Sequence, residues 1–126
     1  MKRAGFTLVV DDNEGVRTSL GALLESNGHS VATAKDIQEA LQQLESGIPE
    51  LLICDYMLEG ETSFRLTQAE VFSSIPTRIL LTGNGLSELD SDVVSRFTDV
   101  VSKSDGSTEL MDAISKSRVA VVQESA

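Results

Sequence analysis

The feature that most constrains the fold is an alternation of short apolar runs with helix-spaced segments, which occurs five times along the chain. The runs are apolar throughout, which is typical of strands buried on both faces of a sheet. Because each such strand is followed by an amphipathic helical pattern, we predict a doubly wound α/β domain with a five-stranded parallel sheet. The predicted strands are residues 6–10, 30–33, 51–54, 77–81 and 98–101.

The predicted helices fill the segments between these strands, with apolar side chains spaced three or four residues apart. Asn13 is a predicted N-cap for the first, and the second begins near Asp36. The third is expected to span Thr62 to Phe72, with its inward face formed by Phe64, Thr67 and Val71. The fourth is short and uses Leu86, Leu89 and Val93, and the last uses Leu110, Ile114 and Val121.

Length and composition indicate one domain. A chain of 126 residues can bury a single core, and we expect that core within residues 6–120, followed by a polar tail at 121–126. Cys54 is the only cysteine and lies in an apolar run, so we expect a buried thiol. The chain has no apolar stretch long enough to span a membrane and no export signal, which predicts a soluble, cytoplasmic protein without membrane insertion.

The formal net charge of −10 should repel nucleic-acid phosphates and anionic lipid surfaces. The aromatic residues are scattered, without the basic neighbours that a base-stacking surface needs. Direct nucleic-acid binding is therefore not expected. Other proteins or small phosphorylated molecules are better candidates for partners.

Polar residues follow the predicted strands at the edge where a doubly wound sheet places its ligand site. Asp11 and Asp12 follow the first strand and Asp55 follows the third. Thr82 follows the fourth strand and Lys103 follows the fifth. Three acids packed together repel one another unless a cation neutralises them, and Mg²⁺ suits a site with few carboxylates. The set therefore predicts a cation beside a carboxylate nucleophile.

From Thr7 to about Ala120 the chain resembles the receiver domain of two-component response regulators. The resemblance rests on four motifs, namely Val9-Val-Asp-Asp12, Ile53-Cys-Asp55, Leu80-Leu-Thr82 and Lys103. It implies that Asp55 accepts a phosphoryl group and that Asp11, Asp12, Asp55 and the backbone carbonyl of Met57 hold Mg²⁺. We also expect the flavodoxin-like strand order 2-1-3-4-5.

The remaining roles follow from the charge of a phosphoryl group. The Lys103 ammonium would donate a hydrogen bond to one phosphoryl oxygen and the Thr82 hydroxyl to another. The backbone amides of Gly83 and Met57 would donate to the remaining oxygens. The resemblance implies a histidine kinase or phosphotransfer protein as donor and a downstream protein partner that binds residues 86–120. It implies self-catalysed phosphotransfer and slow autodephosphorylation, with no turnover of small substrates. The domain could be a whole regulator or part of a hybrid histidine kinase.

The chain departs from the family pattern at several positions around the site. Val100 stands where an aromatic residue is usual, Ser104 where proline is usual, and Glu59 where proline is common. These departures favour a second hypothesis, a degenerate receiver that binds partners without phosphorylation. A third is an aspartyl phosphohydrolase, but such enzymes generally need a second acid at the position of Met57.

Met57 and Asn84 should flank the reacting phosphoryl group, and an apolar Met57 predicts slow self-hydrolysis. His29 directly follows Asn27-Gly28 and is expected to be an exposed turn residue. The acidic residues near the fourth helix form either a solvated face or the border of a surface for a basic partner, and they are Glu88, Asp90 and Asp92.

Overall fold

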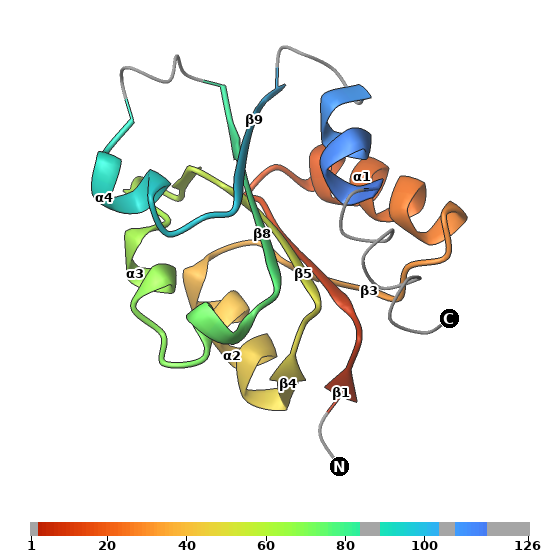
Figure 1. The fold of residues 1–126 in the computed structure, drawn as a ribbon, viewed down its shortest axis with the longest axis horizontal. Helices are drawn as coiled ribbons and strands as arrows, with labels where there is room; N and C mark the ends of the chain where they lie inside the picture. Colours follow the sequence, from red (N-terminus) through yellow and green to blue (C-terminus); the bar gives the residue numbers. More distant parts are fainter. Residues whose placement is uncertain (1–2, 84–88, 104–107, 116–126) are drawn as a thin grey trace.

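Five parallel strands form the central sheet of the computed structural model, which describes residues 3–83, 89–103 and 108–115. The strands are β2 (Thr7–Val10), β3 (Val31–Ala34), β5 (Leu51–Asp55), β8 (Thr77–Thr82) and β9 (Asp99–Ser102). Their spatial order is β3-β2-β5-β8-β9 (Figure 1). Counted along the chain, these five strands lie in the order 2-1-3-4-5, so the predicted flavodoxin-like, doubly wound fold is confirmed.

Helices cover both faces of this sheet. One face carries α2 (Ile37–Ser46), α3 (Phe64–Thr67) and α4 (Ser91–Val94), and the other carries α1 (Glu14–Ser26) and the helical residues 108–115 (Figure 1). Alternate strand residues point to opposite faces. Leu8 and Cys54 therefore pack toward α2, whereas Val9 and Ile53 pack toward α1. Burial on both faces explains why the strand sequences are apolar at successive positions.

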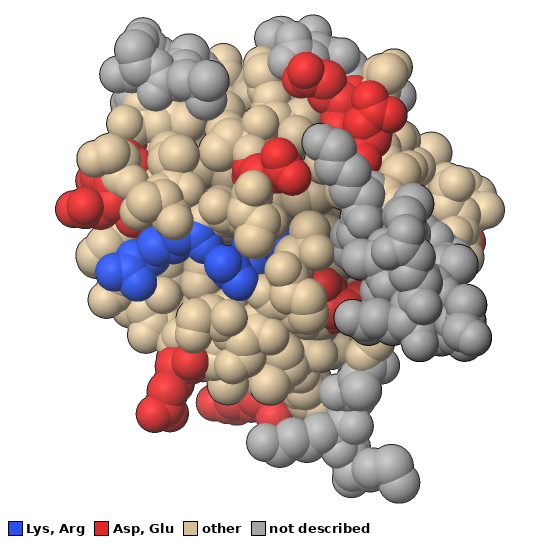
Figure 2. Space-filling model, viewed as in Figure 1, with Lys and Arg blue, Asp and Glu red and all other residues tan. Residues whose placement is uncertain are grey.

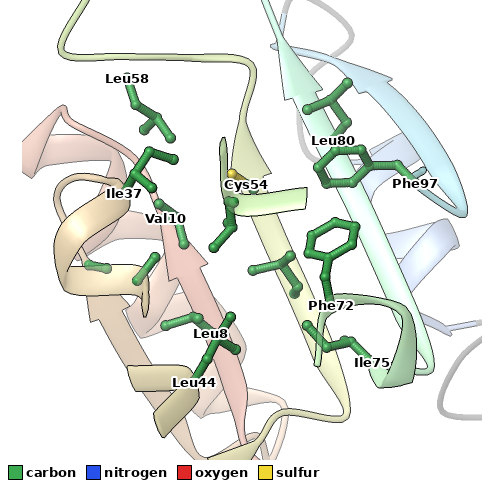
Figure 3. Close-up of a cluster of buried hydrophobic side chains, with 14 of the residues drawn as sticks. Leu8, Val10, Ile37, Leu44, Cys54, Leu58, Phe72, Ile75, Leu80 and Phe97 are labelled. Carbon is green, nitrogen blue, oxygen red and sulfur yellow. The ribbon is translucent and has the colours of Figure 1, made fainter. Parts of the chain in front are cut away.

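The core under α2, α3 and α4 contains large side chains from the sheet and from the segment after α3. Figure 3 shows this cluster, in which Phe72 and Phe97 lie close together. Their ring centroids are 5.4 Å apart with an edge-to-face geometry, which is favourable for aromatic pairs. Cys54 is fully buried in the same cluster, as predicted.

The first two helices begin where the capping signals predict. The Asn13 side chain accepts a hydrogen bond from the Val16 amide at 3.0 Å, and the Asp36 side chain accepts one from the Glu39 amide at 2.8 Å. Each cap gives an otherwise unpaired amide of the first turn a partner, which is typically worth about 1 kcal/mol.

The predicted third helix over Thr62–Phe72 is wrong in its bounds. The chain first forms a hairpin of β6 (Met57–Leu58) and β7 (Glu61–Thr62), and only then the short α3 and the 3₁₀ turn η1 (Phe72–Ser74). Of the residues expected on the inward face, Thr67 is buried and Val71 packs against the core. Phe64 is 42% exposed, and Leu66 is fully buried instead. Local apolar spacing did not reveal the hairpin, which delays the start of the helix to Phe64.

The C-terminal elements agree with the prediction where the structure describes them. Val93 in α4 is buried, as are Leu110 and Ile114 in the helical residues 108–115. Leu86 and Val121, which were assigned to these two helices, lie outside the described residues. A further parallel pair, β1 (Arg3–Ala4) with β4 (Gly47–Ile48), was not predicted.

The expectation of an exposed His29 is wrong. The residue is only 8% exposed, and its Nδ1 lies 3.0 Å from the Thr7 hydroxyl. The turn after α1 brings its backbone amide to the Leu24 carbonyl at 3.0 Å, which places the ring beside the start of β2. His29 is therefore a packed core residue.

Among the described residues, no helix has the length and apolar character that crossing a membrane requires.

Candidate functional site: an acidic pocket at the carboxyl ends of the strands

Parallel register brings the predicted acids to one edge of the sheet. Val10 pairs with Cys54, so Asp11 and Asp55 follow neighbouring positions of β2 and β5. One carboxylate oxygen from each of Asp11, Asp12 and Asp55 can be chosen so that all three lie within 4.8 Å of one another. Residues 44 positions apart in the chain (55 − 11) thus form one acidic pocket.

The backbone at the start of α1 holds Asp11 in place. Its Oδ1 accepts a hydrogen bond from the Asn13 amide at 2.9 Å, and its carbonyl oxygen accepts one from Arg17 Nη1 at 2.7 Å. The residue is 1% exposed. Asp11 therefore presents its second carboxylate oxygen to the pocket from a fixed position.

Lys103 supplies the positive charge at the centre of this pocket. Its Nζ lies 3.1 Å from Asp11 Oδ2 and 3.1 Å from Asp55 Oδ2. Burial tends to lower the pKa of Lys103, but the hydrogen bonds and charges of the two acids raise it by more. The ammonium is therefore held firmly in its charged form.

The balance of charge at Asp55 is different. Burial raises its pKa, the Asp11 charge raises it further, and the opposing effect of Lys103 is smaller. With three carboxylates against one ammonium, the pocket retains excess negative charge. Its chemistry is that of a site that gains by binding a further cation.

Asp12 is exposed, and a backbone amide of the β6–β7 hairpin holds its carboxylate. Its Oδ2 accepts a hydrogen bond from the Glu59 amide at 3.1 Å. Glu59 and Gly60 have φ values of +50° and +83°, as the two central residues of a tight hairpin turn require. Gly60, which adopts a positive φ without steric cost, is the signal that could have suggested this turn, but the sequence analysis missed it.

The remaining predicted site residues lie around this pocket. Thr82 ends β8, pairs with Ser102 of β9 and is 2% exposed. Gly83 follows it and is exposed, and a Cβ at this position would meet no atom within 4 Å. Met57 begins β6 and is 43% exposed. Asn84 and Ser104 lie outside the described residues.

Tyr56 was missed by the sequence analysis and links the pocket to α4. Its amide donates a hydrogen bond to the Leu81 carbonyl at 2.8 Å, and its hydroxyl accepts one from the Asp90 amide at 2.9 Å. Asp90 is the N-cap of α4. The ring is 7% exposed, so the residue next to Asp55 is packed and bonded at both ends.

A doubly wound sheet with an acidic triad, a buried threonine and a lysine at its carboxyl edge defines a receiver-type protein. The family described as "Response regulator receiver domain" matches residues 7–115. The chain belongs to this family, the receiver domains of two-component response regulators.

Curated relatives match only part of this chain. The alkaline phosphatase synthesis transcriptional regulatory protein PhoP of Bacillus subtilis is 47% identical over 51 residues, which are 40% of this chain and 21% of PhoP. Transcriptional regulatory protein AfsQ1 of Streptomyces coelicolor is 36% identical over 59 residues, 47% of this chain and 26% of AfsQ1. The aligned segment thus spans about a fifth to a quarter of these relatives.

Solved structures match nearly the whole chain. Response regulator protein TrrA from Thermotoga maritima, in complex with Mg²⁺–BeF, has a TM-score of 0.74 and 31% identity over 93% of this chain and 99% of its own. A CheY-like receiver domain from Methanospirillum hungatei has a TM-score of 0.81 at 21% identity, covering 97% and 99% of the two chains. The second likeness concerns the fold alone.

Proposed function

We propose that this domain is a phosphoacceptor receiver in which Asp55 takes a phosphoryl group from a histidine kinase or phosphotransfer protein. The observation that carries the proposal is the convergence of Asp11, Asp12 and Asp55 within 4.8 Å, with Lys103 Nζ 3.1 Å from two of them. A partner-binding change on the surface of residues 86–120 would then transmit the signal.

The donor set fits Mg²⁺. The pocket offers carboxylate oxygens, which are hard ligands, and its acids outnumber its one ammonium. Asp11, Asp12, Asp55 and the Met57 carbonyl would hold the ion. Bound Mg²⁺ would neutralise charge on the phosphoryl oxygens during transfer. The Mg²⁺–BeF complex of TrrA, at 31% identity, supports this assignment.

The side chains of this chain account for the rest of the transfer. An Asp55 carboxylate oxygen forms the new O–P bond while the N–P bond of the donor phosphohistidine breaks and its electron pair returns to the imidazole. Lys103, already 3.1 Å from Asp55, can exchange a carboxylate contact for a phosphoryl oxygen. The Thr82 hydroxyl and the Gly83 amide donate to the other oxygens.

The new acyl phosphate adds a charge of about −1.5 to −2 at the end of β5. Attraction of the Thr82 hydroxyl toward this charge would shift the end of β8, whose Leu81 carbonyl accepts the Tyr56 amide at 2.8 Å. Tyr56 in turn contacts the N-cap of α4 through Asp90. We propose this connection as a route from the pocket to the surface of residues 86–120. It would serve in place of the family's usual aromatic residue, for which this chain has Val100.

The test is beryllium fluoride binding in the presence of Mg²⁺, followed by backbone NMR. The wild type should show saturable shifts around the pocket, and Asp55→Asn should show none. Asp112→Asn is a matched control, because Asp112 is an exposed acid on the helical residues 108–115. Equal binding by Asp55→Asn and the wild type would refute the assignment of Asp55.

A second candidate is the degenerate receiver, which Val100 specifically favours. Val100 is partly buried and packs against the core on the α2–α4 face, where it has no ring to reorient. In this case partner binding through residues 86–120 would be the same for the unmodified and the beryllium-fluoride-treated domain. A change in affinity on treatment would favour the phosphoacceptor.

A further inference from the structure

A hollow of about 350 Å³ lies at the other end of β8, where η1 and the segment between α4 and β9 approach α3. Its polar lining consists of Thr67, Gln68, Ser73, Arg78 and Arg96, with the Phe72 ring among the apolar atoms. We call this hollow the arginine groove. None of these residues belongs to the acidic pocket, and Arg78 is four positions from Thr82 along β8 (82 − 78), about 13 Å of strand.

Arg78 is held rigidly in the arginine groove. Its Nε donates a hydrogen bond to the Arg96 carbonyl at 2.8 Å, and its Nη1 donates to the Ile75 carbonyl. The guanidinium carbon lies 5.6 Å from the centroid of the Phe72 ring, within the range of a cation–π contact. These contacts leave Nη2 without a hydrogen bond among the described residues, on a guanidinium that is already fixed in place.

The charges in the arginine groove lack carboxylate partners in the part of the chain that the structure describes. Elsewhere the ion pairs are Lys35 with Glu39, Arg65 with Glu61, and Lys103 with the acidic pocket. Neither Arg78 nor Arg96 forms such a pair with an acid in residues 3–83, 89–103 or 108–115. Figure 2 shows the blue basic atoms of this face gathered in one band, over the region where Figure 1 places α3 and the segment between α4 and β9.

We propose that the arginine groove is a binding site for one oxyanion group, a carboxylate or a phosphate monoester, held between Arg78 and Arg96. Arginine donors match the planar and tetrahedral oxygens of these groups, and hydrogen bonds to a charged group are the stronger kind. Gln68 and Ser73 add neutral polar groups at the rim. The proposal is independent of phosphorylation at Asp55.

Charge and size limit the ligand. The protein carries a net charge of −10, so two arginines cannot hold a polyanion such as a nucleic acid against the overall repulsion. A hollow of about 350 Å³ admits a small molecule or one side chain of a partner. A single oxyanion is the class of ligand that satisfies both limits.

The test is an NMR titration of the full chain with two probes at constant ionic strength, inorganic phosphate and a blocked tripeptide with a central glutamate. We expect saturable shifts at Arg78 Nε–H and at the Ser73 and Gln68 amides, with a Kd of about the millimolar range. Saturation by phosphate alone identifies a small phosphate ligand, and saturation by the peptide alone identifies an acidic side chain. Saturation by both identifies the shared oxyanion chemistry.

Arg96→Gln is the decisive variant, because it removes the exposed guanidinium but keeps the backbone carbonyl that Arg78 contacts. Loss of one charge-assisted contact should weaken binding about tenfold or more. Lys35→Gln is the matched control for a diffuse charge effect and should bind as the wild type does. The proposal is overturned if neither probe saturates, or if the two variants weaken binding equally.

Discussion

The acidic pocket and the arginine groove lie at opposite ends of β8 and use charge in opposite ways. In the pocket, Asp11 and Asp55 face each other across a shared ammonium, so that burial and like charge raise the pKa of Asp55. In the groove, the Arg78 guanidinium donates its hydrogen bonds to neutral backbone carbonyls. The two regions differ in what remains to be neutralised: the pocket has more carboxylates than ammonium and can take a further cation, whereas the Arg78 charge is fixed by neutral carbonyls and can take an anion.

The largest expected effect concerns stability at the arginine groove. Arg78→Met should lower the free energy of unfolding by about 2–3 kcal/mol, because it removes charged donors from at least two carbonyls. Urea unfolding measures this change, and Arg96→Gln is the control, with an expected change within about 0.5 kcal/mol. An unchanged free energy of unfolding in Arg78→Met would mean that this arginine does not stabilise the fold.

The acidic pocket should instead respond to pH through ligand affinity. Above the raised pKa of Asp55 the carboxylate is ionised and can hold Mg²⁺, and as the pH falls through this pKa a proton competes for the same oxygens. Mg²⁺ affinity should then fall by up to about tenfold per pH unit. Calorimetric titrations between neutral and mildly acidic pH measure this slope, and Asp55→Asn should flatten it.

Lys103→Met should separate the two ligands of the acidic pocket. Loss of the ammonium removes a competitor for Asp11 and Asp55, so Mg²⁺ should bind more tightly, by about fivefold. Beryllium fluoride should bind about tenfold more weakly, because one donor to its charged group is lost. Lys35→Met is the control for net charge. Parallel changes in the two affinities would contradict the placement of Lys103 between the acids and the phosphoryl group.

Tyr56→Phe tests the link between the pocket and α4. Removal of the hydroxyl leaves the Asp90 amide without its acceptor, at a cost of about 1 kcal/mol. Hydrogen exchange at the Asp90 amide should become faster in the variant, while beryllium fluoride still binds at Asp55. If shifts on beryllium fluoride binding still reach α4 unchanged, the signal does not pass through this hydrogen bond.

The smallest expected effect is at Met57. Its side chain is 43% exposed and can shield an acyl phosphate from water only in part. Met57→Ala should therefore shorten the lifetime of the phosphorylated protein about twofold to threefold, measured as loss of label. An unchanged lifetime would remove Met57 as a barrier to hydrolysis.

Local signals predicted those elements whose apolar residues follow one period from end to end. The apolar run before Asp11 and the caps at Asn13 and Asp36 indicated β2, α1 and α2 to within a few residues. The prediction for the segment after Asp55 was wrong because the turn at Glu59–Gly60 places Thr62 in a hairpin strand. The helix that follows therefore begins later than predicted. The prediction that His29 is exposed was wrong because its burial depends on β2, which lies beside it only in the folded chain.

The sequence by itself determined that this chain is a doubly wound sheet with acids, a hydroxyl and an ammonium at the carboxyl ends of its strands. Periodicity and strand ends are local properties that can be read along the chain. Only the tertiary structure decided that Glu59 holds Asp12, that Tyr56 reaches Asp90, and that two arginines share one groove. The physical reason is that such contacts depend on backbone direction and on the packing of elements distant in sequence, which no local pattern encodes.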